Sequence, residues 1–144
     1  MHLLDASSNV RLTVNNSQVE TEMEMNFSNA CETSRTFREN NDCAVKALAI
    51  AANVPYEAAH STLALLGRRK GRGTSKGIIS KGFAELNCKL EDVSSQMRAR
   101  TVVSLGRELA NSMGTFIAYT RGHVLCIKDG VVEDWTNGRQ HRIV

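Results

Sequence analysis

Residues 41–52 read Asn41-Asp42-Cys43-Ala44-Val45-Lys46-Ala47-Leu48-Ala49-Ile50-Ala51-Ala52 and carry the strongest structural signal in the chain. Asp42 is a residue type favoured immediately before a helix. After it, Lys46 alone interrupts a run of apolar residues. A helix that is apolar on every side is buried at the centre of a domain. We therefore predict a buried central helix over 43–52 that begins at Cys43.

Outward from this helix towards the C-terminus, the pattern predicts further helices and then strands. Apolar residues at helical spacing indicate helices over 55–67, 76–86 and 102–112. Alternation and the turn pairs Asp129-Gly130 and Asn137-Gly138 indicate strands over 115–120, 123–128, 131–136 and 139–144. Helices followed by an antiparallel sheet predict an α+β domain over residues 35–144.

Towards the N-terminus, the chain is acidic and alternates. Residues 1–34 hold one basic and five acidic side chains, whereas the rest of the chain is basic. Apolar and polar residues alternate over 10–14 and 19–27, and Asn15-Asn16 suits a two-residue turn. We predict an acidic β-ribbon arm in residues 1–34 that docks on its own body or on a second subunit. A homodimer is favoured, because a two-fold arrangement covers both the free edge and the apolar face of the ribbon.

Length and composition exclude several classes of protein. The 144 residues, 42% of them hydrophobic, fit one globular domain. No apolar run approaches a membrane span, and the first residues lack a signal-peptide pattern, so no membrane partner is expected. The four cysteines show neither CxxC nor zinc spacing, so we expect reduced thiols in a cytoplasm, with no metal and no cofactor.

Cys43 is a candidate nucleophile because of its place at the start of the central helix. The helix dipole and the free N–H groups of the first turn stabilise a thiolate there and lower the pKa of the thiol. The same N–H groups suit an oxyanion hole. The alternative interpretation is that a small apolar side chain fills this position in the core.

His123 and Asp134 are predicted to meet on one hairpin. A two-residue loop at Asp129-Gly130 makes His123 and Asp134 diagonal neighbours on one face, within side-chain reach. An otherwise apolar face tolerates an aspartate only with a partner, and orienting an imidazole provides one. A purely structural His–Asp pair at the rim of the sheet is the alternative. In the same register Trp135 lies on the opposite face, and we expect it in the core of the sheet.

Two stretches of the chain support a family resemblance. One is Asn41-Asp42-Cys43-Ala44-Val45-Lys46-Ala47-Leu48-Ala49, followed by Pro55-Tyr56-Glu57-Ala58-Ala59-His60. The other is Gly114-Thr115-Phe116, followed by Arg121-Gly122-His123-Val124-Leu125-Cys126-Ile127-Lys128-Asp129-Gly130-Val131-Val132-Glu133-Asp134. Together they resemble small phage-encoded proteins of the papain-like cysteine peptidase superfamily. They are also similar to bacteriocin leader-processing peptidases, which have an Asp-Cys helix start and a sheet carrying His and then Asp.

The resemblance implies a papain-like fold and a division of roles in the site. Cys43 would be the nucleophile, His123 the general base and Asp134 the orienting acid. Asn40 or Asn41 would stabilise the oxyanion together with the Cys43 backbone N–H. The implied activity is hydrolysis of a peptide or isopeptide bond through an acyl-thioester intermediate. The substrate would be a peptide or a protein, such as a host protein, in the host-cell cytoplasm. Acyl transfer to an amine uses the same groups. A non-catalytic protein of this fold that binds a host factor is the alternative.

A basic, glycine-rich loop lies between two of the predicted helices. Four of its side chains form a possible anion-binding group: Arg68, Arg69, Lys70 and Arg72. A solvated loop is the favoured interpretation, because no aromatic residues lie among the basic ones to stack on bases. We therefore expect a peptide or protein partner rather than nucleic acid.

Overall fold

The computed structural model describes residues 1–5 and 24–144. Its helices are α2 (Phe27–Thr36), α3 (Cys43–Ala52), α4 (Tyr56–Leu65), α5 (Lys76–Glu85) and α6 (Val102–Glu108), with a short 3-10 helix η2 (Ser94–Gln96). Its strands are β1 (His2–Asp5), β2 (Lys89–Asp92), β3 (Thr115–Thr120), β4 (His123–Lys128) and β5 (Val131–Glu133). The described part of the chain is therefore an α+β structure, as the sequence predicts.

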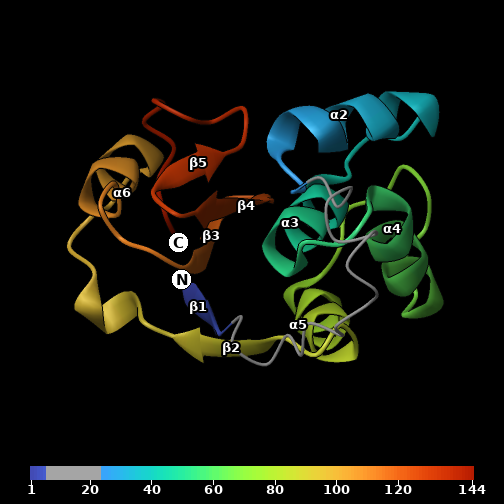
Figure 1. The fold of residues 1–144 in the computed structure, drawn as a ribbon, viewed down its shortest axis with the longest axis horizontal. Coiled ribbons are helices and arrows are strands. Elements are labelled where there is room, and N and C mark those ends of the chain that lie inside the picture. Colours follow the sequence, from blue (N-terminus) through green and yellow to red (C-terminus); the bar gives the residue numbers. More distant parts are fainter. Residues whose placement is uncertain (6–23) are drawn as a thin grey trace, which may run out of the picture.

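The described strands form one antiparallel sheet in the order β2-β1-β3-β4-β5. Figure 1 shows α2 to α5 on one side of this sheet and α6 on the other. Alternate residues of β3 therefore enter two different cores: Ile117 and Tyr119 pack with the larger helical group, and Phe116 and Ala118 pack with α6. This is why β3 is buried along its whole length rather than on one face only.

Helix α3 is the buried central helix that the sequence predicts. Every residue of α3 except Cys43 and Lys46 is buried. The helix lies against β4 on one side and against α2 and α4 on others, so its small alanines face neighbours in several directions. It ends at Asn53, which takes the left-handed conformation with φ of 53° that asparagine tolerates better than most residues. Because the next two residues pack in the core, Cys43 lies at the end of α3 that reaches the surface of the protein.

The N-terminal region differs from the predicted ribbon. Residues 2–5 form β1, which lies inside the sheet between β2 and β3. Phe27 begins α2 instead of ending a strand, because the Asn26 side chain caps the helix. Helix α2, which packs on α3, runs across the predicted boundary at residue 34. The rest of the predicted ribbon, and the dimer contact assigned to it, lie outside the described residues, in 6–23.

The C-terminal half follows the predicted pattern, with shorter elements. Strands β3 and β4 have the predicted bounds, but β5 ends at Glu133. The segment 139–144 forms isolated bridges at Arg142 and Ile143 rather than a strand. Helix α6 ends at Glu108, four residues early relative to the prediction of 102–112. Strand β2 is an element that the sequence pattern did not reveal, because it has only four residues and no clear alternation.

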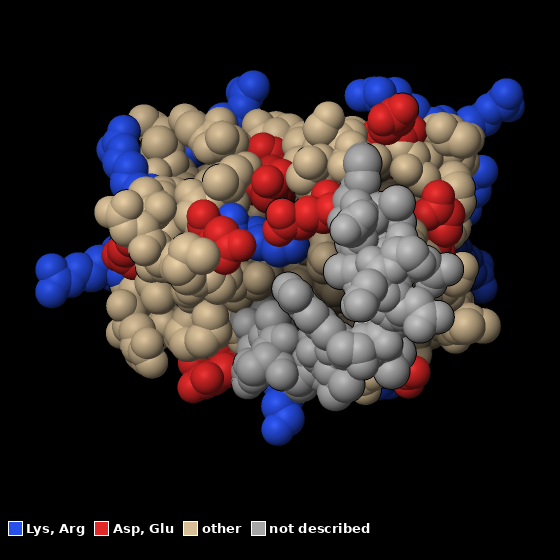
Figure 2. Space-filling model, viewed as in Figure 1, with Lys and Arg blue, Asp and Glu red and all other residues tan. Residues whose placement is uncertain are grey.

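Charged side chains are unevenly distributed over the surface. On the face drawn in Figure 2, Lys and Arg side chains project mainly from the edges of the molecule, and acidic side chains gather near the middle.

Among the helices of the described residues, none combines the length and the apolar character that crossing a bilayer requires.

Candidate active site

Cys43 stands at the first position of α3, with free backbone donors around it. Asp42 occupies the position before the helix, as predicted, but its side chain does not cap the helix. Its carboxylate instead accepts hydrogen bonds from Ser34 Oγ and Tyr56 Oη, each at 2.6 Å, and pairs with Lys46 Nζ at 3.3 Å. The first N–H groups of α3 therefore lack a side-chain cap from Asp42 and remain available to an anion beside Cys43.

The β4–β5 hairpin brings His123 and Asp134 together as the predicted register requires. Lys128 pairs with Val131 across the two-residue loop. One result is that His123 Nε2 lies 2.7 Å from Asp134 Oδ2. The sequence predicts this contact correctly: the two-residue loop sets the register as far as Glu133, which pairs with Cys126, and Asp134 follows Glu133 directly.

Thr136 holds the aspartate in place, and the sequence analysis missed it. Its backbone N–H and its hydroxyl both donate to Asp134 Oδ2, at 3.1 and 2.6 Å. Thr136 is completely buried. The predicted register extends the hairpin beyond Glu133, where β5 ends, and places Thr136 opposite His123; this was the available signal for its role. With His123 and Thr136 both bound to the same oxygen, the carboxylate has one fixed orientation.

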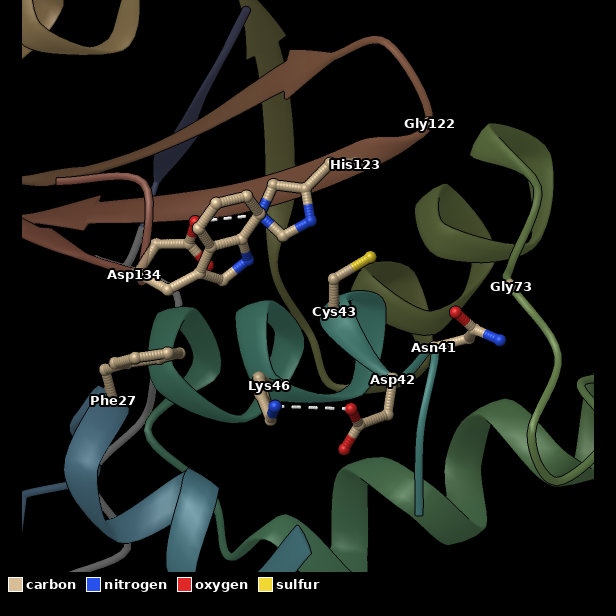
Figure 3. A pocket seen from close by; sticks show the side chains of 10 residues that line it. Phe27, Asn41, Asp42, Cys43, Lys46, Gly73, Gly122, His123 and Asp134 are labelled. Atoms are coloured by element: carbon tan, nitrogen blue, oxygen red, sulfur yellow. Dashed lines mark hydrogen bonds and ion pairs between the residues drawn. The ribbon is translucent and has the colours of Figure 1, made fainter. Parts of the chain in front are cut away.

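The three predicted residues converge on one cleft. A cavity of about 400 Å³ is lined by Phe27, Asn41, Asp42, Cys43, Lys46, Gly73, Gly122, His123, Asp134 and Trp135. Figure 3 shows the Cys43 sulfur facing the ring of His123, with Asp134 on the far side of that ring. Because Nε2 of His123 is bound to Asp134, the nitrogen that faces the sulfur is Nδ1. Cys43 is only partly buried and is accessible from this cleft.

The site favours the charged forms of both Cys43 and His123. Burial alone would raise the pKa of the Cys43 thiol, but hydrogen bonds from His123 and from the backbone of Val124 and Ala44 outweigh it and lower that pKa. Burial would lower the pKa of His123, but its hydrogen bonds to Asp134 and Cys43 raise it to about 9. Opposite shifts in two facing groups favour a thiolate–imidazolium pair over the neutral thiol and imidazole.

Trp135 lies at the mouth of the cleft, and its predicted place in the core of the sheet is wrong. The side chain is 52% exposed. Its ring lies 5.4 Å from that of His123, and 5.2 Å from that of His141. Strand β5 ends two residues before Trp135, so the alternation that assigned it to the core no longer applies. The indole instead lies beside the His123 ring and lines the cleft.

Of the two asparagines predicted to stabilise an oxyanion, Asn41 lies at the cleft. It takes a left-handed conformation with φ of 49°, and its Nδ2 donates to the Gly71 carbonyl at 2.9 Å. A second N–H of the same amide remains for a ligand. Asn40 is exposed and is absent from the cavity lining, so the structure does not bring it to Cys43.

The basic loop divides into one buried and three exposed side chains. Arg68 is 6% exposed and donates to Glu39 Oε2 at 3.0 Å, so it is already paired and unavailable to an external anion. Arg69, Lys70 and Arg72 are exposed. The predicted group of four anion-binding residues is therefore wrong for Arg68.

The buried carboxylate of Glu39 joins this loop to the segment that leads into α3. It also accepts from Gly71 N–H at 2.7 Å and lies 2.7 Å from His60 Nε2. Burial opposes ionisation, but the contacts with Arg68, His60 and Gly71 lower the pKa of Glu39 to about 2. This cluster and the Asn41–Gly71 hydrogen bond fix the wall of the cleft on the side of Gly73.

Comparison of the chain with protein-family models, with curated proteins and with solved structures finds no match.

Proposed function

We propose that the protein is a cysteine hydrolase of papain-like architecture that cleaves a peptide or isopeptide bond at Cys43. One observation carries the proposal: a cysteine at a helix N-terminus faces a histidine whose far nitrogen lies 2.7 Å from a buried aspartate, inside an open cleft. A purely structural His–Asp pair has no need of a facing thiol with a lowered pKa. The resemblance to papain-like cysteine peptidases supports the same assignment.

The first half of the reaction forms an acyl-thioester. His123 Nδ1 holds the proton of Cys43, and the thiolate attacks the carbonyl carbon of the scissile bond. Asp134 keeps Nε2 protonated and the ring oriented. The carbon–nitrogen bond then breaks, and the proton on Nδ1 passes to the leaving amine.

The second half releases the acyl group. Water donates a proton to Nδ1 of His123 and attacks the thioester carbonyl, so that a carboxylic acid leaves and the Cys43 thiol is restored. Donors for the oxyanion in both halves are the backbone N–H groups at the start of α3 and the free N–H of Asn41. An amine in place of water would give acyl transfer by the same route.

Two measurements test the proposal without knowledge of the natural substrate. The first is the rate of alkylation of each cysteine by iodoacetamide at neutral pH, followed by peptide mapping. An ionised thiol at neutral pH has a roughly thirty-fold larger thiolate fraction than an ordinary one, offset in part by lower nucleophilicity. We expect Cys43 to react about ten-fold faster than Cys31, which is a matched control because it is also partly buried. His123→Ala should remove this difference.

The second measurement uses p-nitrophenyl acetate as an activated acyl donor. We expect a burst of p-nitrophenolate, one acetyl group on Cys43 and then steady turnover as the thioester hydrolyses. His123→Ala should acylate slowly and Cys43→Ala should show no burst. Alkylation of Cys43 at the rate of Cys31, unchanged by His123→Ala, would favour the non-catalytic binding protein instead.

A further inference from the structure

We propose that the cleft binds an acidic peptide segment, with Arg72, Arg121 and Arg139 as the contacts for carboxylates of the ligand. That this peptide is a substrate rests on the proposed function; that it binds does not.

Each of the three arginines is next in sequence to, or in contact with, a residue that lines the cavity holding Cys43. Arg72 immediately precedes Gly73, and Arg121 immediately precedes Gly122; both glycines line the cavity. The guanidinium carbon of Arg139 lies 5.7 Å from the centre of the Trp135 ring at the other end. All three arginine side chains are exposed. Figure 3 shows Gly73 and Gly122 on one side of Cys43 and His123, so the chain positions next to these glycines, 72 and 121, lie at that end of the cleft.

Within the part of the chain that the structure describes, these arginines have no internal counter-charge. In residues 1–5 and 24–144, none of the three forms an ion pair with a carboxylate. The nearby carboxylates are already engaged: Asp42 with Ser34, Tyr56 and Lys46, and Asp134 with His123 and Thr136. Two further acids are also bound internally, Glu39 by Arg68 and Glu133 by the Phe27 N–H. The rim therefore carries unpaired positive charge, which an acidic ligand would neutralise.

The walls between the arginines suit a peptide main chain. A Cβ atom placed on Gly73 or on Gly122 would meet nothing within 4 Å. An extended peptide can therefore approach both backbones closely, with its side chains directed towards the rim. A single-stranded nucleic acid stacks its bases on a series of aromatic rings. Apart from His123, the cavity lining offers two aromatic side chains, Phe27 and Trp135. The geometry thus favours an acidic peptide over a polynucleotide.

The test measures binding with catalysis removed. The full chain carrying Cys43→Ala is titrated into a fluorescein-labelled hexapeptide of alternating Glu and Gly, and into the Gln-Gly peptide of equal length, with fluorescence anisotropy as the readout. Each exposed charge pair contributes a few-fold in affinity, so we expect the Glu peptide to bind about ten-fold more tightly at low salt. The difference should fall to about two-fold in 1 M NaCl, because salt screens exposed charges.

Matched variants locate the effect at the rim. Arg121→Gln with Arg139→Gln should abolish most of the preference for Glu, whereas Arg121→Lys with Arg139→Lys should retain it. Lys89→Gln with Arg98→Gln is the control for net charge: it also removes two positive charges, at exposed positions on β2, the strand at the opposite edge of the sheet from β5, and in the segment after η2. It should leave the preference unchanged.

Three results would overturn the inference. They are equal affinity for the Glu and Gln peptides, an equal loss of preference in the control and rim variants, and tighter binding of an oligothymidylate of similar length than of the Glu peptide. The last would identify nucleic acid as the ligand. Tight, rim-dependent binding of the Glu peptide together with failure of Cys43 acylation would refute the proposed hydrolase and leave the acidic ligand in place.

Discussion

The buried carboxylate of Glu39 offers the sharpest test of how the cleft is held together. Glu39→Gln keeps the size of the side chain and removes its charge. The Glu39 side chain is 0% exposed and that of Arg68 is 2% exposed, so the substitution leaves a buried guanidinium without its counter-ion. The amide can still accept a hydrogen bond, so the change isolates charge from shape.

The expected loss of stability is large for one substitution. Removing one partner of a buried ion pair costs about 3 kcal/mol or more. A domain of 144 residues has a free energy of unfolding of roughly 7–20 kcal/mol. For a chain of this size each kcal/mol shifts the melting temperature by about 2–4 °C, so we expect the midpoint to fall by about 10 °C. Circular dichroism during thermal and urea unfolding measures both quantities.

The difference between the two proteins should also depend on pH. The pKa of Glu39 is lowered from 4.5 to about 2 in the folded protein. The stabilisation by its charge is therefore complete above pH 4.5 and is lost as the pH falls from there towards 2. We expect the gap between wild type and Glu39→Gln to be constant near neutrality and to narrow in acid.

Glu57→Gln is the matched control, because Glu57 is exposed on α4 and loses the same charge. It should change the free energy of unfolding by less than about 0.5 kcal/mol. A loss in Glu39→Gln no larger than in the control, or a gap that widens below pH 4.5, would refute the argument. Adding Arg68→Met to Glu39→Gln should recover part of the lost stability, since the unpaired buried charge is then gone.

Three further predictions concern a turn and the catalytic pair. Gly130→Ala should lower the free energy of unfolding by about 3 kcal/mol in urea titrations, because its φ is +83° and a Cβ would lie 2.2 Å from a backbone carbonyl oxygen. Gly138 is the control, since its φ is +79° and a Cβ there would meet nothing within 4 Å. Gly138→Ala should lower the free energy of unfolding by about 1 kcal/mol. The fluorescence of Trp135, the one tryptophan in the chain, should rise as the pH passes about 9. The reason is that the adjacent His123 imidazolium quenches this fluorescence and loses its proton there. An identical pH profile in His123→Ala would contradict this prediction. Asp134→Asn should move that fluorescence midpoint to lower pH, since the His123 charge loses its partner.

Local patterns explain why much of the frame could be predicted. The run of apolar residues in 43–52 has a single plausible environment, and α3 is found there with the predicted bounds. The two-residue loop at Asp129-Gly130 fixes which residues of the hairpin face each other, and the His123–Asp134 contact follows from it. The alternation of apolar and polar residues predicted a strand through residues 25–27, and this prediction was wrong. The Asn26 cap and the hydrogen bond from Phe27 N–H to Glu133 favour the start of a helix there instead.

Two elements form through interactions between neighbours along the chain and could be predicted from the sequence: the buried helix that begins at Cys43, and the hairpin that leads from His123 to Asp134. That these two elements meet is a property of the tertiary structure. Their sequence separation is about 80 residues, and the contact between α3 and β4 depends on the packing of both against the same core. The same holds for the exposure of Trp135 and for the pairing of Arg68 with Glu39. Each depends on which surfaces are brought together in space, and no local period in the sequence encodes that.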